Sequence, residues 1–417
     1  MRRKTKLLAM VLWLSSVAFA VGARAQSGFE EAPVLKASDL APPTMLKGPR
    51  FAVDARVPVV DLLPRFVVRS DFGVFEAHGR DMLGTRVIEV GALAELEKTS
   101  KTEEFLKAAG NATARPVTSA ANMVMNPVDT IKGTPAAVGR FFDRVELGAK
   151  RIGGATQTEG STSDKTVVVT KRVGGVTADV LGYEQERRAL AKRLGVDPYT
   201  TNHVLSEKMN DLAWVAFSGR VGLNTVVAVV VPFSMAISAT SITNDVVWDM
   251  KPADLLTLDE KKLKDMGVGE DRVAALLNNP WYSITALTSL VNSLEALAGV
   301  PGRDQIVAFA GAAGTEDRAR LIVAASEMLA RYHGTVQPVT QVSAPGPIVA
   351  RTKAGSVLVP APLDYVPWTE PVAKFARRPD LKAKTRVVWL TGTLSPRAKR
   401  EFEALGWTVR AGSAPAR

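Results

Sequence analysis

The chain has 417 residues, of which 46% are hydrophobic and 23% charged, with no cysteine, three histidines and a formal net charge of +11. This length is sufficient for two or three domains with sizeable cores. The lack of cysteine excludes disulfides, thiolate zinc sites, iron–sulfur clusters and cysteine nucleophiles, and three histidines nearly exclude a histidine-rich metal centre. We therefore expect no metal and no cofactor.

The first 25 residues have the pattern of a cleaved signal peptide. Four basic residues among the first six precede a mainly apolar stretch over residues 7–20, and Ala23-Arg24-Ala25 offers the small residues of a cleavage site. The alternative is an uncleaved membrane anchor, but the apolar stretch is shorter than the ~20 residues that span a bilayer. We expect cleavage before Gln26 and a periplasmic or secreted protein. Loss of the signal's five basic residues would reduce the net charge from +11 to +6.

The next segments predict an arm, a folded region and a linker. Residues 26–64 contain six prolines and predict an extended arm. Residues 65–150 predict an N-terminal α+β region, with strands at 66–69 and 74–78 before a helix whose apolar residues recur at spacings of three and four. Residues 151–177 are rich in Gly, Ser and Thr and predict a linker.

Residues 178–335 predict a helical domain. The expected helices cover residues 183–194 (ended by Gly195), 202–217 (capped by Asn202), 259–266, 270–277, 284–297 and 304–332, with a break near Gly314. Their short connections predict antiparallel helical hairpins.

The uncharged stretch at 221–242 is long enough to span a membrane. Pro232 and the acidic residue Asp245 favour a buried core helix over a membrane-inserting element.

Residues 336–417 predict a basic C-terminal α/β module. Strands at 387–390 and 407–409 flank a helix that begins with Ser395 as N-cap and Pro396 as its first residue. The predicted fold class is therefore α+β and predominantly α-helical, with a helical-hairpin body and a small strand–helix–strand module at the C-terminus.

The sequence holds few candidates for catalysis. The nucleophile elbow, the H-E-x-x-H zinc motif, the phosphate-binding Walker loop and the EF-hand loop are all missing from it. Glu76 and His78 share one face of a predicted strand, and Asp197 belongs to a polar loop between helices. These are the first catalytic candidates. The alternative is structural, because aspartate in such a loop commonly forms turn hydrogen bonds.

A second candidate site joins the strand at 387–390 to the following helix. Free N–H groups at a helix N-terminus attract anions, especially beyond the carboxyl end of a strand. The candidate anion-binding residues are Thr391, Gly392, Thr393, Ser395 and Arg397.

The positive charge of the mature chain is concentrated near its end. Residues 371–417 carry eleven basic and three acidic residues, a net charge of +8. We predict an exported, non-catalytic cell-envelope protein with a binding or scaffolding role, whose basic module contacts an anionic envelope polymer or lipid headgroups. Export argues against nucleic acid as a partner, and membrane association is not favoured. The alternatives are a secreted hydrolase that uses Glu76, His78 and Asp197, a membrane-active protein that inserts residues 221–242, and a basic face that is merely solvated.

Overall fold

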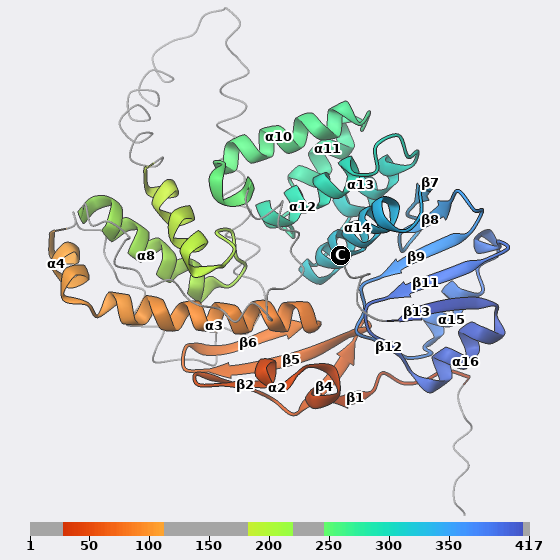
Figure 1. Cartoon of the computed structure of the whole chain (residues 1–417), viewed down its shortest axis with the longest axis horizontal. Helices are drawn as coiled ribbons and strands as arrows, with labels where there is room; N and C mark the ends of the chain where they lie inside the picture. Colours follow the sequence, from red (N-terminus) through yellow and green to blue (C-terminus); the bar gives the residue numbers. More distant parts are fainter. Residues whose placement is uncertain (1–27, 112–181, 220–245, 412–417) are drawn as a thin grey trace, which may run out of the picture.

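The structure, a computed structural model, describes residues 28–111, 182–219 and 246–411 (Figure 1). The predicted signal peptide, the linker at 151–177 and the uncharged stretch at 221–242 lie outside these residues. Among the residues described, no helix combines the length and the apolar character needed to cross a membrane.

The N-terminal part is an antiparallel sheet in the order β1-β4-β5-β3-β2, with β6 paired to β5. Its strands are β1 (Val34–Lys36), β2 (Lys47–Gly48), β3 (Phe51–Val53), β4 (Arg56–Val60), β5 (Leu63–Ser70) and β6 (Gly73–His78). The segment predicted to be an extended arm thus supplies β1–β4 and two short helices, α1 (Ala37–Leu40) and α2 (Pro43–Leu46). Pro43 fits because it starts α2, where its missing N–H costs nothing. The strands predicted at 66–69 and 74–78 are confirmed as parts of β5 and β6.

Helix α3 (Arg80–Ser100) covers this sheet (Figure 1). Its first half packs on the strands through Leu83 and Val87. Its second half, through Leu93 and Leu96, packs against the helix over residues 182–194 and α8 (His203–Gly219). A further short helix, α4 (Glu103–Asn111), contacts α8. The predicted helix end and helix cap are confirmed. Gly195 has a φ of +66° after the helix over residues 182–194, and the Asn202 side chain accepts the Leu205 N–H at 3.3 Å at the start of α8.

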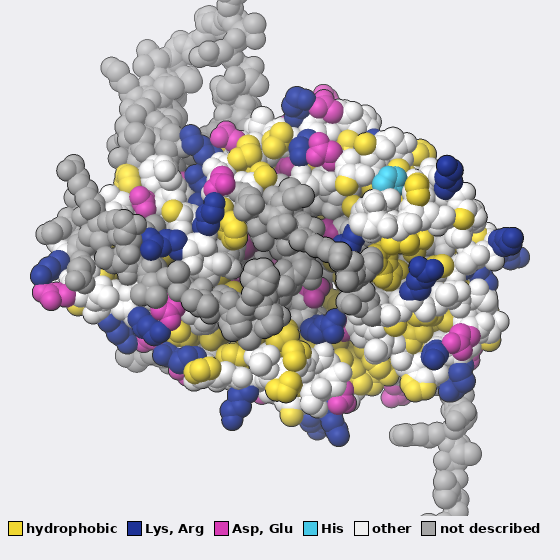
Figure 2. Space-filling model, viewed as in Figure 1, with side chains coloured by type: hydrophobic (Ala, Val, Ile, Leu, Met, Phe, Trp, Pro, Cys, Tyr) yellow, Lys and Arg dark blue, Asp and Glu magenta, His cyan; other side chains and the backbone are white. Residues whose placement is uncertain are grey.

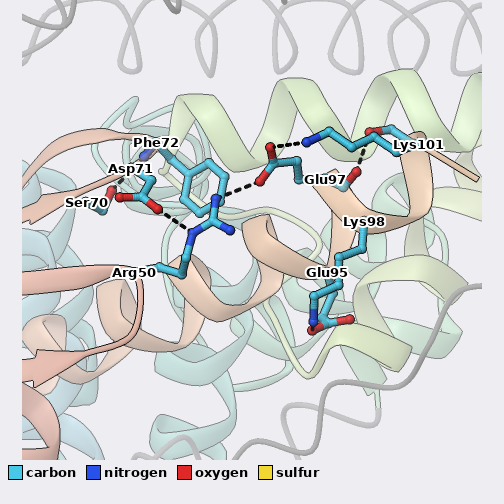
Figure 3. Close-up of polar contacts among 9 residues, drawn as sticks. Arg50, Ser70, Asp71, Phe72, Glu95, Glu97, Lys98 and Lys101 are labelled. Carbon is cyan, nitrogen blue, oxygen red and sulfur yellow. Dashed lines mark hydrogen bonds and ion pairs between the residues drawn. The ribbon is translucent and has the colours of Figure 1, made fainter.

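Arg50 ties two turns of the sheet to α3 (Figure 3). Its guanidinium lies 2.5 Å from the carboxylate of Asp71, in the turn between β5 and β6, and 2.7 Å from that of Glu97 on α3. The same group stacks over the Phe72 ring at 5.0 Å. Because the ions are solvent-exposed, this cluster orients the turns more than it stabilises the fold.

The central helices are α10 (Pro252–Asp265), α11 (Glu270–Leu277), α12 (Ile284–Glu295), α13 (Arg303–Gly311) and α14 (Glu316–Thr335). They do not form a body of helical hairpins. Next-but-one helices pack together, α10 on α12 on α14 and α11 on α13. Gly311 permits the close approach of α13 to α11, since a Cβ there would lie 3.2 Å from the Cβ of Ala275. Short connections bring successive helices near each other without making them the main packing partners.

The C-terminal part is a five-stranded mixed sheet in the order β13-β11-β9-β8-β7. Its strands are β7 (Val339–Ser343), β8 (Val349–Thr352), β9 (Val357–Ala361), β11 (Arg386–Leu390) and β13 (Trp407–Ala411). One face shares a core with the central helices, where Trp389 packs on Tyr332 of α14. The other face is covered by α15 (Glu370–Ala376) and α16 (Pro396–Ala404). The predicted strand–helix–strand unit is confirmed as parallel β11–α16–β13.

A third, small sheet pairs β10 (Tyr365–Val366) with β12 (Thr393–Leu394). The predicted fold class, a predominantly helical protein with a helical-hairpin body, is therefore wrong. The described residues form a mixed α+β protein with three sheets and no clear helical-hairpin body. The prolines at 33–64 do not exclude strands, and short connections between helices do not determine which helices pack together.

Candidate functional site

His78 lies at the end of β6 between two carboxylates. Its Nδ1 is hydrogen-bonded to Asp317, in the first turn of α14, and its Nε2 is 3.4 Å from Glu76 Oε2. Glu76 and His78 do share a strand face, as the sequence predicts, while Asp317 comes from 239 residues further along the chain. This cluster joins the N-terminal sheet to the central helices.

The hydrogen bond with Asp317 raises the pKa of His78 above its usual value, although burial and the nearby Arg65 oppose the shift. The folded protein therefore keeps the His78 proton to a higher pH than the unfolded chain does. Each ring nitrogen faces a carboxylate, so neither is directed at a hydroxyl that it could activate as a general base. The arrangement suits a structural ion pair better than a catalytic dyad.

We expect His78→Gln to lower the free energy of unfolding by about 1 kcal/mol at pH 5–6. A histidine whose folded pKa is raised stabilises the fold fully below its unfolded pKa, near 6.5, and this stabilisation is lost as pH rises through the folded pKa. The difference between wild type and variant should therefore shrink above neutral pH. Urea unfolding from pH 5 to 9 measures it. His203→Gln is the control, because among the described residues His203 pairs only with Glu207 of the same helix, at 3.1 Å. A pH-independent difference for His78→Gln would contradict the prediction.

Asp197 belongs to a different cluster from His78. Its Oδ1 accepts the Tyr199 N–H at 2.8 Å and the Thr285 hydroxyl at 2.6 Å, at the start of α12. Burial raises the pKa of Asp197, and these two hydrogen bonds partly oppose the shift. The three catalytic candidates are thus divided between two places, and Asp197 makes the turn hydrogen bonds that the structural alternative assigns to it.

Glu89 on α3 contacts the same loop that contains Asp197. Its side chain is 2% exposed, and its carboxylate pairs with Arg86 at 2.6 Å and accepts from the Asn202 amide at 3.0 Å and from the Thr200 hydroxyl. Glu89 is not among the residues that the sequence motifs single out. The available signal was its position between Val87 and Val90 on the buried face of a helix, because a carboxylate there must be paired.

Helix α12 donates hydroxyls to three carboxyl groups from three different elements. Thr285 donates to Asp197, Thr288 to Asp259 of α10, and Ser289 to Glu327 of α14. Burial raises the pKa of Asp259 and that of Glu327 to about 7. The three hydroxyl residues lie on one face of α12. Through them, α12 is hydrogen-bonded to the loop after Gly195, to α10 and to α14.

The predicted anion-binding junction is part of the small β10–β12 sheet. Its main-chain N–H groups donate to carbonyls of residues 361–366, namely Thr391 to Ala361, Gly392 to Leu363, Thr393 to Asp364 and Ser395 to Val366. Gly392 is required there, because a Cβ would lie 1.9 Å from the Asp364 carbonyl oxygen. The N–H groups of these four residues are therefore engaged by main chain.

A carboxylate of the chain itself lies at the start of α16. Glu30 Oε2 accepts the Ser395 hydroxyl and the Trp368 N–H, each at 2.5 Å. Arg397 donates to the Gly28 carbonyl at 2.8 Å. Ser395 and Arg397 therefore do contact an acidic segment, but it comes from the N-terminal end of the described chain. Because the two segments are 365 residues apart, no local pattern could have paired them.

Asp364 makes a comparable contact at the start of α3. Its carboxylate accepts the Arg80 N–H at 2.6 Å, and burial raises its pKa. Gly79, which precedes Arg80 and the start of α3, has a φ of +89°, so a residue with a side chain would be strained at this position. The C-terminal part thus caps the helix that covers the N-terminal sheet.

The described residues include no group of three or more His, Asp or Glu side chains placed to hold a metal ion. No protein-family model, no curated protein and no solved structure matches the chain. The arguments for function therefore depend on the sequence patterns and on the geometry of the described residues. In that geometry, the clusters containing His78, Asp197 and Ser395 each join segments that are distant in sequence.

Proposed function

We propose that this is an exported cell-envelope protein with a binding or scaffolding role, which contacts an anionic envelope polymer or lipid headgroups through its C-terminal module. The supporting observation is a set of exposed cations without ion-pair partners among the described residues: Lys382, Lys384, Lys399, Arg400 and Arg410. In Figure 2, separate Lys and Arg side chains are visible over the C-terminal elements on the right of the view, with fewer Asp and Glu among them.

Two acidic residues of the C-terminal module are already paired with cations other than these five. Glu370 pairs with Lys374 at 2.7 Å, and Asp380 pairs with Arg378 at 2.5 Å. These pairs leave the excess positive charge of the module exposed to solvent. A surface of this kind attracts polyanions and anionic membranes.

A non-catalytic role agrees with the contacts of the candidate catalytic residues. The hydrolase alternative depends on a dispersed carboxylate/His site with Glu76, His78 and Asp197 as its first candidates. These residues occupy two clusters, in which His78 pairs with Asp317 and Asp197 accepts hydrogen bonds from Tyr199 and Thr285. The membrane-insertion alternative depends on residues 221–242, which lie outside the described residues.

The test is neutralisation of four of these cations to Gln in the full mature chain, at Lys382, Lys384, Lys399 and Arg400. We expect binding to polygalacturonate or to phosphatidylglycerol vesicles to weaken by about tenfold or more at low salt, since each cation near an anionic surface contributes about 1 kcal/mol. Binding by the wild type should also fall as salt is raised.

The matched control neutralises Lys36, Lys47, Arg56 and Lys251, which are equally exposed and lie outside the C-terminal module. Both variants lose four positive charges, so a difference between them reports on location and not on net charge. Equal weakening in the two variants, or salt-independent binding, would sink the proposal.

A further inference from the structure

The first described residues, 28–30, bind to the surface of the C-terminal module. In Figure 1 the N-terminal segment, drawn in red, runs beneath the module beside α16. The Glu30 N–H donates to the Trp368 carbonyl at 2.8 Å, while the Trp368 N–H and the Ser395 hydroxyl donate to the Glu30 carboxylate. Phe29 packs on the apolar cluster beneath α15 and α16. One carboxylate and one extended stretch of backbone are thus recognised together.

The groups that hold this carboxylate are buried. Ser395 is 1% exposed, and it also caps α16 by accepting the Ala398 N–H at 2.9 Å. Trp368 is fully buried, and its indole N–H has no hydrogen-bond partner among the described residues. A buried hydroxyl, a main-chain N–H and the positive end of a helix dipole at one point form an anion receptor. Arg397, in the first turn of α16, donates to the nearby Gly28 carbonyl at 2.8 Å.

We propose that this receptor, formed by Ser395, the Trp368 N–H and Arg397, binds a carboxylate or phosphate group of the anionic envelope polymer, and that Glu30 is a resident competitor that this group displaces. The inference rests on the proposed function of the C-terminal module. The exposed Lys399 and Arg400 of α16 lie on the same helix, so a polymer bound to them brings its acidic groups to the receptor.

The competition has a defined physical basis. Glu30 is tethered, so its effective concentration at the receptor is in the millimolar range or higher, and a single small anion competes poorly. A polyanion that also contacts the neighbouring cations competes better, because its second contact is itself intramolecular. Binding of the polymer would therefore release the N-terminal segment, whereas a small anion would bind only when Glu30 is removed.

The first experiment tests the receptor without any polymer, by chemical rescue of Glu30→Ala. Acetate supplies the missing carboxylate, and we expect it to raise the Tm of this variant by about 2–4 °C over sodium chloride of equal ionic strength. Glu31→Ala is the matched control, since Glu31 is the adjacent exposed acid and its removal changes the charge equally. Adding Ser395→Gly to Glu30→Ala should abolish the rescue, at little cost to the helix cap.

The second experiment measures polygalacturonate binding by the full mature chain. We expect Glu30→Ala to bind about tenfold more tightly than Glu31→Ala, and the polymer to accelerate hydrogen exchange at the Glu30 N–H of the wild type. Glu30→Gln, which keeps the side-chain size, serves if Glu30→Ala fails to fold.

The outcomes separate the two proposals. The receptor is refuted if acetate raises the Tm of Glu30→Ala no more than chloride does, or if Glu30→Ala and Glu31→Ala bind the polymer equally. Neither result contradicts the proposed function of the basic surface. If the four-cation variant binds as the wild type does, the proposed function fails even where acetate rescue succeeds. If Glu30→Ala strengthens binding to phosphatidylglycerol vesicles and not to the polymer, the polymer assignment is overturned.

Discussion

Replacing Glu89 with alanine is expected to lower the free energy of unfolding by about 3–5 kcal/mol, the loss typical of breaking a buried ion pair. The carboxylate is 2% exposed and has three partners from two segments, which are Arg86 on the same helix and Thr200 and Asn202 in the loop before α8. Its removal leaves the Arg86 guanidinium, 11% exposed, with the Thr201 hydroxyl at 3.1 Å as its remaining side-chain partner among the described residues. A buried cation without its counter-ion is destabilising well beyond the value of one hydrogen bond.

The matched control for Glu89→Ala is Glu95→Ala. Both residues are on α3, and both carboxylates pair with a cation within a turn, but the partner of Glu95 is the exposed Lys98 at 2.5 Å (Figure 3). Because the Lys98 end of this pair is exposed to solvent, the pair contributes at most about 1 kcal/mol. Urea unfolding of the two variants compares them directly. Similar losses in both would mean that the Glu89 cluster is not an organising contact between α3 and the loop before α8.

Local sequence signals located many elements of this protein well. The helix predicted at 270–277 is α11, Ser395 and Pro396 begin α16, and Asn202 caps α8. In each of these cases the determining interactions lie within a few residues. A cap accepts an N–H two or three residues away, and the apolar spacing of a helix repeats over a single turn.

What the sequence left undetermined depends on contacts between distant segments. The prolines of residues 33–64 indicate only where N–H groups are missing. Strand β4 can contain Pro58 because the ladder to β5 begins only at Val59, and because the N–H of Val59 donates to Pro33 beside β1. The pairing of His78 with Asp317 and of Glu30 with Ser395 joins residues separated by more than two hundred positions. Candidate residues could therefore be chosen by type, but their partners, and hence their roles, could not.

Replacing Asp259 with asparagine is expected to stabilise the protein at neutral pH. Asp259 is fully buried on α10; one carboxyl oxygen accepts the Thr288 hydroxyl at 2.8 Å, and the other has no partner among the described residues. Burial raises the pKa of this carboxyl from 3.8 to about 7, so the folded state holds a proton that the unfolded state releases. Asparagine keeps an acceptor for Thr288 and carries no charge at any pH.

The sign of the pH dependence follows from this difference in bound protons. Between about pH 4 and pH 7 the unfolded wild type binds fewer protons than the folded state, so its stability falls as pH rises, by up to about 1.4 kcal/mol per unit. The advantage of Asp259→Asn should therefore grow across this range to a few kcal/mol and remain constant above about pH 7. Other titrating groups, including Glu327, are present in both proteins and cancel in the comparison.

Asp265→Asn is the control on the same helix, because Asp265 is exposed and pairs with Lys261 at 2.5 Å, so its loss should cost at most about 1 kcal/mol. Parallel stability curves for wild type and Asp259→Asn from pH 4.5 to 8 would show that Asp259 ionises in the folded protein as readily as in the unfolded chain.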